Sequence, residues 1–196
     1  MESLTVIFAG PQGSGKDTQV ALLKNYLTHH DSTPVVHFDA VTELRAFAHE
    51  GGYTQDIVEK SLMRGELQPM FVLAHAMSRF FITLLKGNEH LLVSGFPRSD
   101  DQMMLFESAI SFYKRKQPVL LYLVVPEEVS VERLMKRGRS DDTEESIRKR
   151  LHWNQEQTLP VMKAFQKNPL YRYIEIDGTA SIEAIHAEIL KQLNLV

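Results

Sequence analysis

The stretch Gly10–Thr18, with the sequence Gly-Pro-Gln-Gly-Ser-Gly-Lys-Asp-Thr, constrains the fold of this chain of 196 residues most strongly. It follows the apolar run Leu4–Ala9 and precedes apolar residues spaced by three and four between Val20 and Leu27. This pattern predicts a strand, a glycine-rich loop and a helix. Glycines let the backbone N–H groups of such a loop point inward, while the helix N-terminus and Lys16 add positive charge. The loop is therefore predicted to bind phosphate.

The loop departs from the usual phosphate-loop pattern at one position. Gly10, four intervening residues and Gly15-Lys16 match the pattern, but Asp17 stands where a Ser or Thr hydroxyl usually contacts Mg2+. The hydroxyl comes one residue later, at Thr18. A glycine-rich turn without any ligand is the alternative. The lysine, placed between a predicted strand and a predicted helix, favours a nucleotide site.

The composition is that of a globular domain with a buried core. Hydrophobic residues make up 43% of the chain and charged residues 24%, and the net charge of -3 argues against extended binding to a nucleic-acid backbone. The chain has no cysteine, which excludes disulfides and thiolate metal sites. It has no apolar run of membrane-spanning length and begins without the basic residues of a signal peptide. We therefore expect a cytoplasmic protein without a nucleic-acid or membrane partner.

Four further apolar runs predict strands, and the segments between them predict helices. The last run contains Arg172 and Glu175, which places it near an edge of the sheet. Because strands that alternate with helices form right-handed crossovers, we expect an α/β fold with a doubly wound five-stranded parallel sheet. Ligands of such sheets lie beyond the carboxyl ends of the strands. The four runs are Val35–Phe38, Leu91–Val93, Val119–Val125 and Tyr171–Ile176.

The region 40–87 is expected to be entirely helical and to form an insert over the carboxyl edge of the sheet. Apolar spacing predicts three helices there, with Ile57 and Phe71 on the apolar faces of the second and third. A closing helix is expected to have an inner apolar stripe that begins at Ile182. Pro160 is expected to bend the long helix that precedes the last strand.

Arginines follow one predicted strand and gather in one later segment. Arg98 ends the turn Gly95-Phe96-Pro97-Arg98, at the same predicted edge as the phosphate loop. Between residues 133 and 150 arginine predominates over lysine, and arginine suits bidentate contact with phosphate oxygens. A solvated helical face is the alternative for such a charge run. Phosphoryl transfer requires positive groups on the moving phosphate and exclusion of water, and an arginine-bearing lid in the break 138–142 would supply both.

Four blocks occur in one order across nearly the whole chain: Gly10–Gln19, Gly95–Arg98 with Gln102, Arg133–Arg137, and Arg139–Asp142 continuing to Arg150-Leu151. In this combination the chain resembles the adenylate kinases and their nucleoside monophosphate (NMP) kinase relatives. The resemblance implies a single kinase domain with a phosphate loop. Its parts are a core (1–39, 88–137 and 143–196), a helical NMP-binding insert (40–87) and a short lid (138–142).

The resemblance also implies an ATP site and a set of catalytic residues. Lys16 and the loop N–H groups would hold the β- and γ-phosphates, Arg133 would lie against the adenine, and the backbone near Ala180 would touch the base. The implied ATP-binding residues are Gly10, Gly13, Ser14, Gly15, Lys16, Asp17, Thr18, Arg133 and Ala180. The implied catalytic residues are Lys16, Arg98, Arg137, Arg139, Arg150, Asp141 and Asp142, of which the two aspartates would fix the lid arginines.

The acceptor implied by the resemblance is AMP. Arg45 and Arg98 resemble the pair that binds the acceptor's phosphate. Gln102 stands where the family reads the base, and its amide can both donate to and accept from adenine, whereas pyrimidine kinases of the family resemble one another in having Asn there. The implied AMP-binding residues are Arg45, Leu67, Gly95, Arg98, Gln102, Arg139 and Arg150.

Two departures from the family concern Mg2+. The family usually has Gly where Asp17 stands, and an Asp that orients waters around Mg2+ where Ser94 stands. We assign no certain direct ligand: the ion would be held through phosphates and water, with Asp17 and Thr18 as possible contacts. Our hypothesis is that Asp17 takes over the role of the missing Asp. His37 is interpreted as a packing or surface residue.

The acceptor pocket departs from the family as well, with Ala40–Glu43 before Arg45 and Gln68 before Pro69. The expected protein is a monomer that needs Mg2+ and converts ATP and AMP into two ADP. The same reaction with UMP, CMP or a deoxynucleotide as acceptor is one alternative. A nucleotide-binding regulator that has lost turnover is the other.

Overall fold

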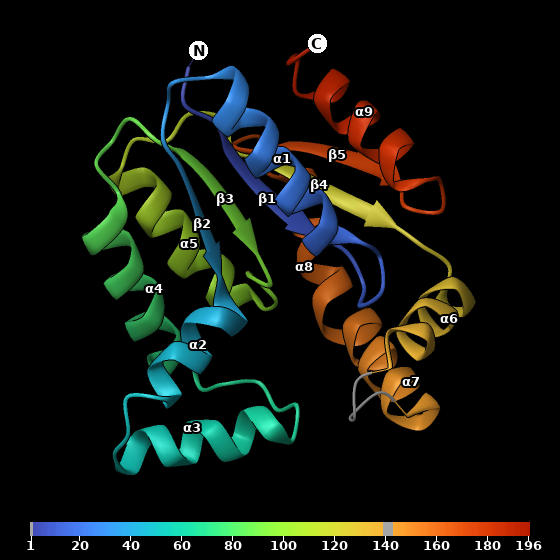
Figure 1. The fold of residues 1–196 in the computed structure, drawn as a ribbon. Helices are drawn as coiled ribbons and strands as arrows, with labels where there is room; N and C mark the ends of the chain where they lie inside the picture. The colour runs from blue at the N-terminus through green and yellow to red at the C-terminus, as the bar shows by residue number, and fades with distance from the viewer. Residues whose placement is uncertain (1, 139–142) are drawn as a thin grey trace.

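The computed structural model describes residues 2–138 and 143–196. In this part of the chain five strands form a parallel sheet of order β2-β3-β1-β4-β5, with helices on both faces (Figure 1). The predicted doubly wound α/β sheet is confirmed, and the last strand lies at an edge as expected. The strands are β1 (Thr5–Ala9), β2 (Val35–Asp39), β3 (His90–Ser94), β4 (Val119–Val124) and β5 (Arg172–Asp177).

Alternate residues of each strand face opposite sides of the sheet. In β1, Val6 and Phe8 pack on one side, and Ile7 packs on the other. Because helices cover both sides, the strands read as continuous apolar runs. The helices on the first side are α1 (Lys16–His30) and α9 (Ile182–Gln192), and those on the second are α4 (Met70–Leu84), α5 (Asp100–Phe112) and α8 (Leu159–Lys167) (Figure 1).

Three helices separate β2 from β3: α2 (Ala40–Ala48), α3 (Tyr53–Met63) and α4. Helix α2 contacts both α3 and α4, and α3 lies farthest from the sheet (Figure 1). The expected orientation of two side chains is wrong, because Ile57 is 51% exposed and Phe71 is 70% exposed. Helix α3 is covered mainly on the side of α2, so its apolar residues are not all buried.

A second group of helices follows β4 in the chain. Helix α6 (Glu127–Arg137) packs on α7 (Glu144–Trp153), which continues through the π-helix η1 (Asn154–Thr158) into α8. The π-helix comes directly before Leu159-Pro160, where a bend was expected. Proline has no N–H with which to complete an α-helical hydrogen bond, and the turn before it takes the wider π form.

The loops that follow β1 and β3 emerge side by side, because Phe8 is paired in register with Ser94. They lie at the carboxyl edge of the sheet, and both chain ends lie at the opposite edge (Figure 1). Within the described residues, no helix is both long and apolar enough to cross a membrane. The expected division into core, insert and lid stays a prediction, and most of the expected lid, residues 139–142, lies outside the described residues.

Candidate active site

The phosphate loop forms a compact turn between β1 and α1. Ser14 N–H donates to the carbonyl oxygen of Pro11 (3.2 Å), and Lys16 Nζ donates to the same oxygen (3.1 Å). A Cβ atom on Gly13, whose φ is +81°, would lie 2.8 Å from the carbonyl oxygen of Ser130, so glycine allows α6 to approach the loop closely. The Ser14 hydroxyl is fully buried and has no hydrogen-bond partner among the described residues.

A cavity of about 390 Å³ is lined in part by this loop and the start of α1. Arg133 lines it, and Arg133 Nη1 donates to the carbonyl oxygens of Gly178 (2.8 Å) and Gly13 (3.4 Å). Ile182 lines this cavity and is 51% exposed, which explains why it does not belong to the inner stripe expected for α9. The lining residues are Gly13–Gln19 of the loop and α1, Arg133, Leu134 and Arg137 of α6, and Ala180, Ile182 and Ile185.

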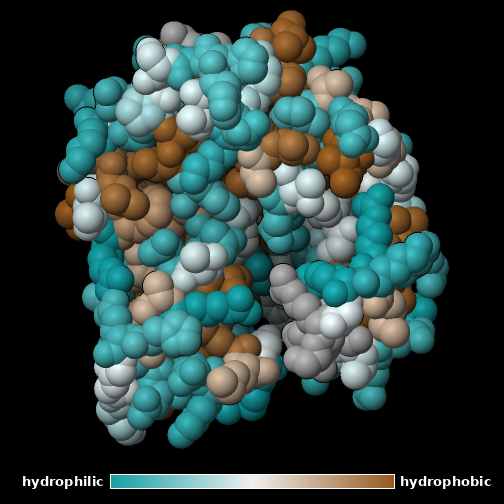
Figure 2. All heavy atoms as spheres, in the orientation of Figure 1, coloured by the Kyte–Doolittle hydropathy of each residue, from teal (hydrophilic) through white to brown (hydrophobic). Residues whose placement is uncertain are grey.

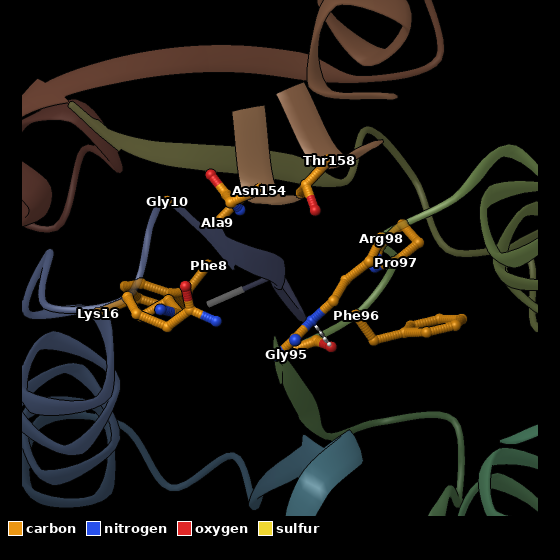
Figure 3. A pocket seen from close by; sticks show the side chains of 11 residues that line it. Phe8, Ala9, Gly10, Lys16, Gly95, Phe96, Pro97, Arg98, Asn154 and Thr158 are labelled. Carbon is orange, nitrogen blue, oxygen red and sulfur yellow. Dashed lines mark hydrogen bonds between the residues drawn. The ribbon is translucent and has the colours of Figure 1, made fainter. Parts of the chain in front are cut away.

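A smaller cavity of about 30 Å³ lies between the phosphate loop and the Gly95–Arg98 turn (Figure 3). Lys16 and Arg98 lie on opposite sides of it, and Arg98 Nε donates to the carbonyl oxygen of Gly95 (2.8 Å). Lys16 lines both cavities. The surface is hollowed near the middle of this face of the molecule (Figure 2).

Partly buried positive charge dominates this junction. Burial lowers the pKa of Lys16 from 10.5 to about 8, although the neighbouring carboxylates Asp17 and Asp39 favour its charged form. Burial likewise lowers the pKa of Arg98, which stays protonated because arginine begins from a far higher value. Cations that are costly to bury beside each other are stabilised by a polyanion, and a nucleotide phosphate chain is such a ligand.

Gln102 is buried at the first turn of α5, and its Oε1 accepts a hydrogen bond from the backbone N–H of Arg98 (2.7 Å). Two of the residues that the sequence assigns to the acceptor, Arg98 and Gln102, are therefore hydrogen-bonded to each other. Arg45 is exposed on α2, and Leu67 is 43% exposed in the connection between α3 and α4. Arg45, Leu67 and Gln102 lie outside the lining of both cavities.

The structure describes only some of the catalytic residues that were predicted at the end of α6 and beyond it. Arg137 is exposed at the end of α6, and Arg150 on α7 donates from Nε to the carbonyl oxygen of Ser146 (3.2 Å). Arg139, Asp141 and Asp142 lie outside the described residues. The roles of these five residues stay predictions.

Two groups of residues at the site were not found from the sequence. Asn154 and Thr158, on the π-helix, line the smaller cavity, and Thr158 Oγ1 is buried without a hydrogen-bond partner among the described residues (Figure 3). At the tips of β2 and β3, Ser94 Oγ donates to Asp39 Oδ2 (2.8 Å) and is 2.9 Å from Nε2 of His37. His37 is thus part of a hydrogen-bonded group at the carboxyl edge, and not simply a packing or surface residue. In the sequence, the available signal for this group was the polar residue at the end of β2 and at the end of β3.

Comparison with known proteins supports the family resemblance that the sequence indicates. A family model described as adenylate kinase matches residues 8–170. An adenylate kinase of Porphyromonas gingivalis is 35% identical over 195 residues, which cover 95% of this chain and 93% of the relative. An adenylate kinase of Thermosynechococcus vestitus is 31% identical over 97% of each chain. A UMP-CMP kinase of Lentinula edodes is 33% identical over 93% of this chain and 82% of the relative.

The family match begins at the end of β1 and extends over the phosphate loop, the Gly95–Arg98 turn and helices α6 to α8. The matches agree with the geometry, in which a glycine-rich loop with a partly buried lysine faces an arginine across the smaller of the two cavities. The chain is a phosphotransferase and belongs to the adenylate kinase family of nucleoside monophosphate kinases.

Proposed function

We propose that this chain catalyses reversible phosphoryl transfer between ATP and AMP, giving two ADP, with Mg2+. The observation that carries the proposal is the position of Lys16, which lines both cavities. The larger cavity, with the phosphate loop and Arg133, suits the donor nucleotide. The smaller one, with Arg98, suits the phosphate of the acceptor. A phosphoryl group that passes from one to the other moves beside Lys16.

In this reaction an oxygen of the acceptor's phosphate forms a bond to the γ-phosphorus of ATP, while the bond between that phosphorus and the bridging oxygen breaks and ADP leaves. The attacking oxygen is already anionic at neutral pH, so the protein need not supply a base. Positioning and charge stabilisation account for catalysis of this kind. Lys16 and Arg98 supply the charge from opposite sides, and burial of both strengthens their interaction with phosphate.

The residues at the site fit a magnesium ion bound mainly by phosphates and water. The described residues contain no group of three or more His, Cys, Asp or Glu side chains that could hold a metal by themselves. Mg2+ typically keeps several waters and binds through one or two carboxylates plus substrate phosphates. Asp17 and Thr18 are exposed at the start of α1 and could contact the hydrated ion. Bound there, the ion would neutralise part of the phosphate charge.

AMP is favoured as acceptor by the amide of Gln102, which is held beside Arg98. Two of the relatives described above are named adenylate kinase and one is named UMP-CMP kinase, so a pyrimidine acceptor is the second candidate. Both candidates use the same chemistry and the same donor site. They differ only in the base that the acceptor pocket prefers.

A panel of acceptors tests the proposal. ATP and Mg2+ are combined with AMP, dAMP, UMP or CMP, and the diphosphates are quantified. We expect kcat/KM for AMP to exceed that for UMP and CMP at least tenfold, which corresponds to about 1.4 kcal/mol. A higher value for UMP or CMP would show a pyrimidine kinase. Tight binding of a two-headed adenosine polyphosphate without any product would show a regulator without turnover.

A pair of arginine variants tests the acceptor site. Arg98→Ala should lower kcat/KM for the acceptor at least 100-fold, because it removes a buried charged contact to phosphate that is worth about 3 kcal/mol. Arg64→Ala is the matched control, since Arg64 is exposed and pairs only with Glu66 two residues away in the described structure. Similar effects of the two substitutions would contradict the assignment of Arg98.

A further inference from the structure

Asp39 and Ser94 end two neighbouring strands and are paired in register at the carboxyl edge of the sheet. Ser94 Oγ donates a hydrogen bond of 2.8 Å to Oδ2 of Asp39. The other carboxylate oxygen, Oδ1, accepts from the backbone N–H of Thr42 (2.7 Å) and caps α2. Each oxygen of this carboxylate thus accepts a hydrogen bond, and the carboxylate is fixed in orientation.

The hydrogen bond between His37 and Ser94 completes this arrangement. A serine hydroxyl has one proton, and that of Ser94 is directed to Asp39. His37 Nε2, 2.9 Å from Ser94 Oγ, must therefore carry a proton and donate it to the hydroxyl. The result is a chain of donors from His37 through Ser94 to Asp39. Such a chain strengthens each hydrogen bond within it and points toward the carboxylate.

The carboxylate of Asp39 lies beside the groups assigned to phosphate. A Cβ atom on Gly95, which lines the smaller cavity, would lie 3.5 Å from Asp39 Oδ2 and 3.4 Å from Arg98 Nη2. Lys16 also interacts electrostatically with Asp39. Burial raises the pKa of Asp39, but hydrogen bonds from Thr42 and Ser94 lower it below its usual value. Asp39 is therefore an anion that lies beside the cations Lys16 and Arg98, at the rim of the phosphate site proposed above.

An anion at a polyphosphate site repels the substrate unless a cation lies between them. We propose that Asp39, held in place by Ser94, is the carboxylate that orients the water shell of the nucleotide-bound Mg2+ in this chain. The inference rests on the proposed function. Asp39 thus takes the role that we expected Asp17 to have from the sequence. Ser94 and His37 are then positioning residues.

Asp39 suits this role better than Asp17 for a geometric reason. Asp17 is exposed in the first turn of α1, whereas Asp39 is half-buried and oriented by two hydrogen bonds. Groups that act on a metal through its water depend on such a fixed orientation. The pair also accounts for a serine at position 94: the two strand tips carry one carboxylate and one hydroxyl in contact, and the carboxylate is on β2.

The test measures metal binding directly. Mn2+ is used in place of Mg2+, and its affinity for the protein–ATP complex is measured by electron paramagnetic resonance in the absence of any acceptor. Asp39→Asn should weaken Mn2+ binding about tenfold, in the range found when groups around a metal's ligands are removed. This variant should fold, because Asn caps a helix as well as Asp does. Asp100→Asn, an exposed carboxylate of α5, is the matched control and should change the affinity less than twofold.

An exchange variant separates the metal role from a structural one. In the double variant Asp39→Ser/Ser94→Asp the carboxylate moves to β3, the serine still caps α2, and His37 Nε2–H faces a carboxylate oxygen. We expect Mn2+ affinity to return to within about threefold of the wild type, whereas Asp39→Ser alone stays about tenfold weaker.

Three results would overturn the inference: unchanged Mn2+ affinity in Asp39→Asn, no recovery in the exchange variant, or a tenfold loss in Asp17→Asn while Asp39→Asn has no effect. The last result would return the role to Asp17. Failure of the proposed function has a different readout, namely the absence of diphosphate products with every monophosphate. The two readouts are independent, because the Mn2+ measurement contains no acceptor and needs no turnover.

Discussion

Arg133 of α6, which lines the larger cavity, donates a hydrogen bond of 2.8 Å to the carbonyl oxygen of Gly178, and so connects α6 to the segment that follows β5. A charged hydrogen bond of this kind is worth about 1.5 kcal/mol or more. Arg133→Ala should therefore raise the KM for ATP about tenfold and change the KM for the acceptor little. Initial rates with each substrate varied in turn provide the measurement.

The control for Arg133 is Lys136→Ala, on the same helix. Lys136 is exposed and pairs with Glu132 four residues earlier, a contact that contributes only tenths of a kcal/mol. It should leave both KM values within about twofold. An equal rise in both KM values for Arg133→Ala would show that Arg133 supports the whole site rather than the donor half.

The lowered pKa of Lys16 predicts that ATP binding depends on pH in the alkaline range. Because burial lowers this pKa to about 8, the free protein loses the Lys16 proton as the pH rises above 8. A triphosphate favours the charged form, so binding above pH 8 takes up a proton. The Kd for ATP should therefore rise about tenfold between pH 7 and pH 9. Calorimetry in two buffers of different ionisation enthalpy measures both the Kd and the proton uptake.

Two conservative variants control the Lys16 experiment. Lys16→Arg should flatten the pH profile, because arginine stays protonated throughout this range. Lys24→Arg, an exposed position on the same helix, should keep the profile of the wild type. A Kd that is constant from pH 7 to pH 9 in the wild type, without proton uptake, would contradict the prediction.

The bond from Arg98 N–H to Gln102 Oε1 leaves the amide nitrogen of Gln102 as the group with two protons to donate. Gln102→Glu keeps the oxygen that accepts from Arg98 but removes these donors. If Gln102 donates to the acceptor base, the KM for AMP should rise at least tenfold while the KM for ATP stays nearly constant. Gln166→Glu, an exposed position on α8, introduces the same charge and serves as control. Equal KM values for AMP in the two variants would exclude this contact.

Acid stability should depend on Asp31 and His90. Nδ1 of the fully buried His90 accepts from Leu4 N–H (2.9 Å), so the ring proton is on Nε2, which donates to Asp31 Oδ2 (3.0 Å). This hydrogen bond lowers the pKa of Asp31 from 3.8 to about 2. The stabilisation is complete above pH 3.8 and is lost as the pH falls through 2.

Asp31→Asn should therefore lose less unfolding free energy than the wild type between pH 4 and pH 2, because it has no carboxylate to protonate. Urea unfolding at several pH values in this interval measures the two slopes. Asp56→Asn, an exposed carboxylate on α3, should behave like the wild type. Parallel slopes for Asp31→Asn and the wild type would show that the bond to His90 does not affect stability.

The sheet was predictable because each strand is an apolar run of its own, and the order of strands and helices limits how they can connect. The placement of the phosphate loop and Arg98 at one edge followed from the same rule. Individual side chains were less predictable. Ile57 has the spacing of a buried residue, but burial depends on which neighbours reach α3, and local spacing does not contain that information.

The sequence shows a polar residue at the end of each of the two strands, but it could not show that Asp39 and Ser94 are in contact, because 55 residues separate them and the register of two parallel strands has no local signal. Asn154 and Thr158 were missed for another reason. A π-helix has more residues per turn than an α-helix, so it changes which side chains face the site after it begins. Periodicity analysis assumes one constant angle per residue and loses its phase at such a turn.

Both chain ends lie at the edge of the sheet opposite the carboxyl edge, where the phosphate loop and the Gly95–Arg98 turn lie (Figure 1). A fusion partner, an affinity tag or a surface linker attached at either end would therefore point away from the hollow that the proposed function assigns to the substrates. Both ends can also be anchored at once, for example in a force-spectroscopy experiment, without covering that hollow. Such an instrument would pull on β1 and α9 from the side where the strands begin, and nucleotides could still bind while tension is applied.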